Sequence, residues 1–245
     1  MTRTSTQTTA QILRERILEG NILPGTTLRQ DSLAQELGVS RTPLRTALAE
    51  LARDGLVTYE ANRGYAVRAF DIADIKSAYD VRAMLEGLAC RLAAKHISRE
   101  QIETLADCVQ NGDEILSSGV LAPEKLAPYR RMNVEFHETI IAASQNPWIG
   151  DFVTRAHNVP LSSDRIFFWE DFDIIHRSHN DHHRILAALR AGDGRRAELL
   201  MWEHVINAGD VLIEKVAPRL EPLGGRIPFA GNCDEISLNP KGTQE

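Results

Sequence analysis

The sequence predicts a mainly α-helical protein with one small β-hairpin near its N-terminus and an antiparallel α-helical bundle after it. Three observations lead to this fold class. Apolar residues recur with the 3.6-residue period of a helix along most of the chain. Two runs, "LVTYE" and "GYAVRAF", are instead rich in β-forming residues. Charge also divides the chain, since residues 1–70 hold 9 Lys and Arg against 7 Asp and Glu, whereas residues 71–218 hold 16 against 23. The chain therefore consists of a mildly basic head and an acidic body.

The head, residues 1–70, contains three predicted helices. The first lies in "TAQILRERILEG" and stops at Gly20, and "ILPGTTL" follows it as a turn. The second lies in "RQDSLAQELGV" and ends at Gly38. The third begins after Ser40, a residue type suited to an N-cap, and stops at Gly55. The two β-rich runs flank "ANRG" and predict a hairpin. Helix, glycine turn, helix and hairpin together predict a winged helix-turn-helix domain.

The start of the third helix carries side chains suited to reading DNA. In a helix-turn-helix domain this helix enters the major groove with its N-terminus first. An arginine fork matches guanine O6 and N7 or a phosphate, and hydroxyls and free N–H groups match phosphate oxygens. A basic residue beside a flexible glycine at the hairpin tip suits a minor groove or the DNA backbone. The candidate DNA-binding residues are Ser40, Arg41, Thr42, Arg45, Arg63 and Gly64. The alternative is that the arginines only solvate a surface helix.

The body, residues 71–218, shows a helical pattern almost throughout and predicts a bundle that forms one domain. Its helices are expected at 71–96, 98–117, 122–143, 146–157, 169–191 and 193–217. The remaining stretch, 219–245, is rich in Pro and Gly without periodicity and predicts a mobile tail.

Histidines in the body indicate a metal site. His182 lies three residues before Ile185 and seven before Leu189, so it is expected to point inward with these apolar residues. His137 and His204 are expected to point inward from two other helices. Three imidazoles that converge in a bundle suit Zn²⁺, Ni²⁺ or another divalent ion. The alternative for each is a hydrogen-bonded core histidine.

Two further histidines lie beside His182 in "HNDHH". His183 is about 100° further around the helix, and His179 is expected between the solvent and core sides. Either these two residues belong to a solvated patch or they add ligands to the metal site.

Composition favours a soluble, cytoplasmic protein that contacts no membrane. No apolar run reaches the roughly 18 residues of a membrane span, and the polar N-terminus lacks the apolar segment of a signal peptide. The cysteines are widely spaced and odd in number, which is typical of reduced packing residues. They are Cys90, Cys108 and Cys233.

The head resembles a known family in three stretches, "ILEGNILPGTTL", "LAQELGVSRTPLRTALAELARDGLV" and "NRGYAV". They are similar to the DNA-binding domain of GntR-type bacterial transcription regulators. The resemblance implies that Arg41 and Arg45 read or position DNA, with help from Ser40, Thr42 and the wing tip at 63–64. It also implies a homodimer on a pseudo-palindromic operator.

The body resembles the all-helical effector (FCD) domain of the FadR subfamily in "YDVRAMLEGLACRLAA", "FHETIIAAS", "HHRILAALRAGD" and "AELLMWEH". In many members an Asp, a His four residues later and two more His hold a metal. The matching positions here are Asn133, His137, His182 and His204. Asn133 departs from this pattern, because its amide oxygen is a neutral and weaker ligand than a carboxylate. Arg82 matches a position that helps to hold an effector carboxylate, although a surface ion pair is an equal alternative.

These residues lead to one main functional hypothesis and two alternatives. The main one is a repressor that a small carboxylic acid, bound near a metal in the body, releases from operator DNA. The first alternative is a metal-dependent hydrolase or lyase that uses the histidines, although the chain has no HExxH motif and no obvious general base. The second is a helical scaffold whose head binds DNA constitutively.

Overall fold

A computed structural model describes residues 5–18, 21–22, 25–159 and 172–220 of the chain. Contacts divide the chain into two compact units. One comprises residues 1–72 and the residues from Lys215 onward, and the other comprises residues 73–214.

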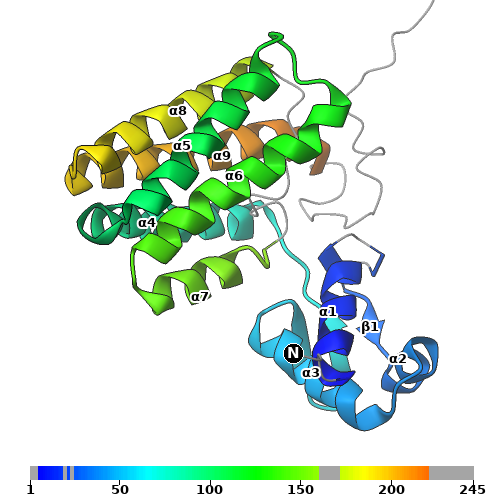
Figure 1. The fold of residues 1–245 in the computed structure, drawn as a ribbon. Coiled ribbons are helices and arrows are strands. Elements are labelled where there is room, and N and C mark those ends of the chain that lie inside the picture. Colours follow the sequence, from blue (N-terminus) through cyan, green and yellow to red (C-terminus); the bar gives the residue numbers. More distant parts are fainter. Residues whose placement is uncertain (1–4, 19–20, 23–24, 160–171, 221–245) are drawn as a thin grey trace, which may run out of the picture. The chain divides into compact units, whose positions relative to one another are not determined.

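In its described part, the head contains three helices (Figure 1) and a three-stranded antiparallel sheet of order β1-β3-β2. The helices are α1 (Ser5–Leu18), α2 (Gln30–Leu37) and α3 (Arg41–Arg53), and the strands are β1 (Thr27–Leu28), β2 (Val57–Glu60) and β3 (Gly64–Val67). The three helices and the hairpin confirm the predicted winged helix-turn-helix.

The sequence-based prediction missed strand β1. The "ILPGTTL" stretch was expected to be a turn, but Thr27 pairs with Ala66 and Leu28 pairs with Tyr65 of β3. Two residues are too short to show strand alternation, and pairing with β3 forms the strand. This pairing places Leu28, which is buried, under the helices.

Caps and turns fix the ends of the head's elements. Gly38 ends α2 in the left-handed region at φ 64°, a conformation that a residue without Cβ adopts at low cost. Ser40 occupies the N-cap of α3 as predicted, in an extended conformation and without a side-chain capping hydrogen bond. Gly20, the predicted end of the first helix, lies outside the described residues.

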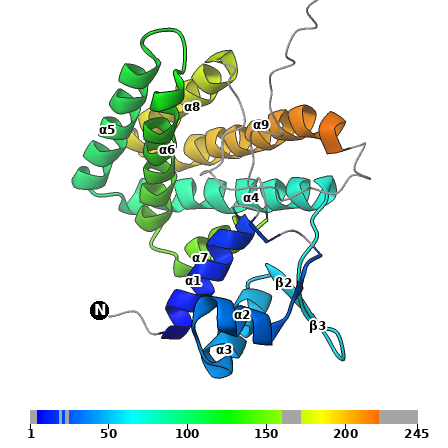
Figure 2. The same ribbon diagram turned by 90° about the vertical axis from the view of Figure 1, so that its right-hand side faces the viewer.

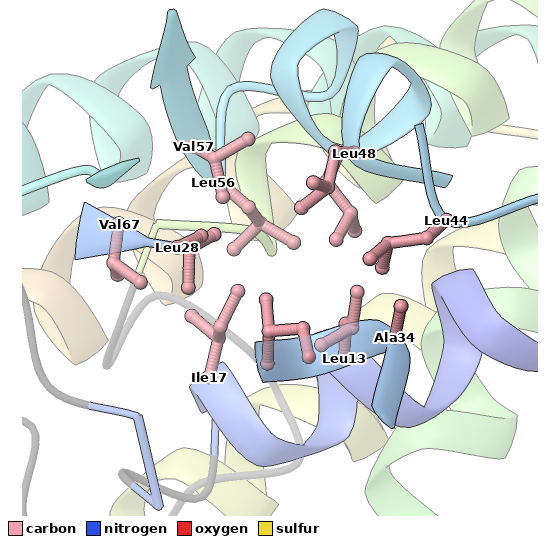
Figure 3. Close-up of a cluster of buried hydrophobic side chains, with 11 residues drawn as sticks. Leu13, Ile17, Leu28, Ala34, Leu44, Leu48, Leu56, Val57 and Val67 are labelled. Carbon is pink, nitrogen blue, oxygen red and sulfur yellow. The ribbon is translucent and has the colours of Figure 1, made fainter. Parts of the chain in front are cut away.

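The core of the head joins the helices to the sheet. Figure 3 shows apolar side chains from α1, α2, α3 and the strands pointing toward one another. The labelled residues are Leu13, Ile17, Leu28, Ala34, Leu44, Leu48, Leu56, Val57 and Val67. Because Leu44 and Leu48 point into this core, the opposite face of α3 is left for solvent.

The body contains six helices within its described part, each within three residues of a predicted one. They are α4 (Ile72–His96), α5 (Arg99–Leu116), α6 (Pro123–Ala143), α7 (Pro147–Ala156), α8 (Phe172–Arg190) and α9 (Gly194–Leu220). In Figures 1 and 2, α5 lies beside α6 and α8. Figure 2 shows α4 beside α9, where a Cβ added to Gly87 would lie 3.1 Å from the Glu198 carbonyl oxygen. Within the described residues, no helix is long and apolar enough to span a membrane.

The predicted tail and the cysteines are covered only in part. Helix α9 ends at Leu220, three residues beyond its predicted end, and the rest of the tail, 221–245, lies outside the described residues. Cys90 and Cys108 are free and buried, while Cys233 also lies outside the described residues.

Candidate functional site

Helix α3 presents its candidate DNA-binding residues to solvent. Ser40, Arg41, Thr42 and Arg45 are all exposed. The Arg41 guanidinium lies 2.8 Å from Asp31 Oδ1, and both side chains are more than 70% exposed. Such a surface ion pair contributes less than about 1 kcal/mol, so a phosphate can replace the carboxylate at little cost.

The hairpin between β2 and β3 carries the remaining candidates. Gly64 has φ 82° and begins β3, and the neighbouring Asn62 also has a positive φ, 70°. The Arg63 side chain is 83% exposed, and its Nη1 lies 3.2 Å from Glu60 Oε2. The left-handed residues therefore turn the chain so that Arg63 projects at the tip of the wing.

The structure brings together the three histidines that were expected to converge. His137 on α6, His182 on α8 and His204 on α9 are buried, and each offers one ligand atom within 4.8 Å of the others. The ring centroids are separated by 4.9–5.6 Å. Asn133 is also buried and lies one helical turn before His137 on α6. We call the three histidines the imidazole cluster.

Sequence analysis missed Glu86, the carboxylate that orients His137. Glu86 Oε2 lies 2.6 Å from His137 Nδ1, and Glu86 Oε1 accepts a 2.8 Å hydrogen bond from Arg82 Nε. A carboxylate on Nδ1 fixes the tautomer of an imidazole and leaves Nε2 as the ligand atom. Arg82 and Glu86 are four apart in "YDVRAMLE", and this spacing was the available signal.

Arg82 forms an ion pair with a nearby acid, as the alternative expected, but the expectation that this pair lies at the surface is wrong. The side chains of Arg82 and Glu86 are only 2% and 1% exposed. The guanidinium also lies 5.2 Å from the centroid of the Tyr79 ring. Helix α4 is buried along much of its length, so this polar pair lies in the interior beside the imidazole cluster.

A second ion pair borders His204. Asp181 Oδ2 lies 3.8 Å from His204 Nδ1, which exceeds hydrogen-bond length, and Asp181 Oδ1 accepts a 2.7 Å hydrogen bond from Arg184. Burial raises the pKa of Asp181, but interactions with His204 and Arg184 lower it below the ordinary value overall. Asp181 therefore remains charged and is balanced by Arg184.

His182 is the member of the imidazole cluster that has the most buried ring nitrogens without a hydrogen-bond partner within the described residues. Both of its ring nitrogens are buried and have no hydrogen-bond partner among the described residues. Burial, followed by repulsion from His204 and the other nearby imidazoles, lowers its pKa well below 6.5. The ring is therefore neutral at pH 7, the form that binds a metal. Buried nitrogens without partners are rare in proteins, and a divalent ion would satisfy one of them. The donor set thus fits a metal.

The expectation that His179 lies between the solvent and core sides is wrong. The residue is 1% exposed, and its ring lies against Gly112 of α5, where a Cβ would come within 2.1 Å of His179 Cε1. The missing Cβ leaves the space that this ring fills. His179 and His183 do not join the imidazole cluster. Their Nε2 atoms instead lie 3.1 and 2.9 Å from Asp113 Oδ1.

A winged helix-turn-helix binds DNA. Joined to a separate helical domain with buried potential ligands, it is typical of transcription regulators that carry an effector domain. Residues 5–67 match the family described as bacterial regulatory proteins, gntR family, and residues 77–207 match the FCD domain. The chain belongs to the GntR family of bacterial regulatory proteins and carries an FCD effector domain. This confirms the family predicted from the sequence.

Individual relatives agree with the family. The Nta operon transcriptional regulator of Aminobacter aminovorans is 31% identical over 78% of this chain and 86% of its own length. LutR of Bacillus subtilis is 27% identical over 80% of this chain and 95% of its own length. The transcriptional repressor RspR of Escherichia coli K12 is 28% identical over 80% of this chain and 83% of its own length.

Solved structures share the fold. McbR/YncC of E. coli superposes with a TM-score of 0.65 at 19% identity, covering 87% of this chain and 99% of that one. Lar of Listeria monocytogenes gives a TM-score of 0.55 at 21% identity, covering 86% and 99%. At such identities the likeness extends to the fold alone.

Proposed function

We propose that this regulator is a homodimeric repressor of the FadR subfamily that leaves its operator when a small carboxylic acid binds beside a metal in the body. The exposed basic start of α3 and the buried imidazole cluster carry the proposal. A relative, RspR, is named a repressor. Membership in a regulator family favours this function over a metal-dependent hydrolase or lyase.

The head would bind DNA through one face of α3 and the tip of the wing. Arg41 and Arg45 lie one turn apart at the N-terminal end of α3, so two guanidinium groups enter the groove together. Ser40 and Thr42 offer hydroxyls to phosphate oxygens. Arg63, next to Gly64, contacts a minor groove or the backbone beside the site. A dimer presents two such surfaces to a pseudo-palindromic operator.

Arg45→Ala is expected to weaken binding to a specific operator by about 1–3 kcal/mol, because the fork contacts a base edge. Fluorescence anisotropy on DNA from the chain's own promoter region, at one fixed salt concentration, measures the loss. Arg53→Ala is the matched control, since Arg53 is exposed at the other end of α3. An equal loss on unrelated DNA would assign Arg45 to a phosphate, and unchanged binding would contradict its role.

In the body, Asn133, His137, His182 and His204 would hold a zinc or nickel ion. When bound, the ion supplies two positive charges and positions at which a carboxylate oxygen can bind. Asn133 and the imidazoles are neutral ligands. The Glu86 carboxylate is balanced by Arg82, and Asp181 is balanced by Arg184. The ligands and the carboxylates near them therefore leave the positive charge of the metal ion uncompensated. This excess positive charge favours an anionic effector.

Arg82 would add to the selection of a carboxylate. Its guanidinium is buried within the group that includes Glu86 and His137, so it acts in a poorly hydrated environment where charge interactions are strong. An effector that draws on Arg82 competes with Glu86 for the guanidinium. Effector binding would thereby be linked to the position of Glu86 on α4, and by reciprocity to the affinity for DNA.

Isothermal titration calorimetry of the full chain tests this function. A panel of small carboxylic acids is titrated into protein loaded with Zn²⁺ and into protein treated with EDTA. We expect at least one acid to bind at least about tenfold more tightly to the loaded protein and to reduce operator binding in a gel shift. Equal binding with and without metal, or DNA binding that no acid changes, would overturn the proposal.

A further inference from the structure

Helix α8 carries a second group of potential ligands on a face next to that of His182. His179 and His183 are one turn apart, and their Nε2 atoms meet the same oxygen of Asp113 on α5 at 3.1 and 2.9 Å. One ligand atom of each of these three residues lies within 4.8 Å of the other two. The group shares no residue with the imidazole cluster.

The spacing of these atoms suits a shared ion. Two ligand atoms that bind one Zn²⁺ tetrahedrally at about 2.0–2.2 Å lie about 3.3–3.6 Å apart. The two nitrogen–oxygen distances, 3.1 and 2.9 Å, are a few tenths of an ångström shorter, so small shifts in rotamers would open enough space for an ion between the three side chains. Two imidazoles and one carboxylate are ligands typical of Zn²⁺, Co²⁺, Ni²⁺ and Fe²⁺.

We propose that Asp113, His179 and His183 form a second site for a divalent transition-metal ion, distinct from the imidazole cluster. Asp113 and His183 have side chains that are 52% and 45% exposed, while His179 is buried. The site therefore opens to solvent on one side. An ion held there exchanges directly with the medium and keeps coordination positions for water or a further ligand.

The packing of α5 against α8 positions the buried ligand. A Cβ added to Gly112 would lie 2.1 Å from Cε1 and 2.6 Å from Nδ1 of His179, closer than atoms can approach. Glycine next to Asp113 therefore lets the imidazole approach the α5 backbone closely beside the carboxylate. Because one ligand comes from α5 and two from α8, a bound ion would also cross-link these helices.

The two groups of ligands are close but separable. The ring centroids of His179 and His182 lie 5.7 Å apart, and the rings are nearly perpendicular. His182 belongs to the imidazole cluster. A substitution of an exposed member of the second group, Asp113 or His183, removes a ligand without opening a cavity in the bundle interior.

The test is the stoichiometry of Co²⁺ binding to the full chain. After equilibrium dialysis at pH 7.5, we expect two equivalents per chain in the wild type by mass spectrometry of the metal. Asp113→Ala and His183→Ala should each retain one equivalent, because loss of a ligand weakens the second site at least about 10- to 100-fold. His176→Ala is the matched control. His176 is exposed on the same helix, stacks on Phe172 and does not belong to the group of Asp113, His179 and His183.

Variants of the imidazole cluster separate this inference from the proposed function. If His182→Phe removes one equivalent and Asp113→Ala removes the other, both sites exist. A single equivalent that Asp113→Ala removes and His182→Phe retains supports the second site and contradicts the first. If Asp113→Ala and His183→Ala bind as much Co²⁺ as His176→Ala does, the second site is overturned.

Discussion

Glu86→Leu is expected to lower the free energy of unfolding of the helical body by about 3–5 kcal/mol. The substitution leaves the 2%-exposed Arg82 guanidinium without the carboxylate that neutralises it. It also removes the hydrogen bond to His137 Nδ1. Urea denaturation followed by circular dichroism, with metal removed by EDTA, measures the change.

An exposed pair of the same geometry provides the control. Arg99 Nε and Glu103 Oε1 are also 2.8 Å apart at i, i+4, but the side chains are 93% and 60% exposed. Glu103→Leu should therefore cost less than about 1 kcal/mol. Combining Glu86→Leu with Arg82→Met should recover much of the lost stability, because no unbalanced charge remains buried. Equal effects of the two single glutamate substitutions would contradict this account of Glu86.

His182→Phe is expected to abolish metal binding at the imidazole cluster while leaving the metal-free body at least as stable as the wild type. Both ring nitrogens of His182 are buried and have no hydrogen-bond partner in the described part of the chain, so replacing them by carbon loses no hydrogen bond. The phenyl ring also keeps the stacking on Phe136, whose ring centroid lies 4.3 Å away.

Thermal unfolding with and without Zn²⁺ separates the two parts of this prediction. At a free metal concentration of 100 times the Kd, a metal site that exists only in the folded state adds about 2.7 kcal/mol to the free energy of unfolding. The His182→Phe variant should lose the contribution of the imidazole cluster. The comparison is made in the Asp113→Ala background, where the second proposed site is absent. A variant that is destabilised in EDTA but still responds fully to Zn²⁺ would show that His182 is a packing residue.

Much of the fold could be predicted from the sequence because the periodicity of apolar residues and the residues that begin or end helices indicate the same boundaries in most elements. Gly38 and Ser40 mark the turn between α2 and α3, and the order of polar and apolar residues fixes the exposed face of α3. Strand β1 could not be predicted, because two residues carry no period and their pairing depends on β3, which is distant in sequence.

The candidate site could be predicted in part, for a related reason. His137, His182 and His204 follow helix faces, so their inward direction was readable. Contacts across helices were not readable. The burial of His179 depends on the absence of a side chain at Gly112, and the role of Glu86 depends on how α4 packs against α6. Gly112 is far in sequence from His179, and Glu86 is far in sequence from His137, so the sequence around each histidine does not reveal these contacts.

Helix α4 carries Glu86 and also follows the wing almost directly, since only residues 68–71 separate it from β3. Ile72 lies about 21 Å along the helix axis from Glu86, at a rise of about 1.5 Å per residue. A tilt of about 10° pivoting at Glu86 would displace Ile72 by about 3.6 Å. This displacement is similar to the spacing of about 3.4 Å between stacked nucleotides, so a small reorientation at one carboxylate would be enlarged to the scale of a base-pair step where the helix begins.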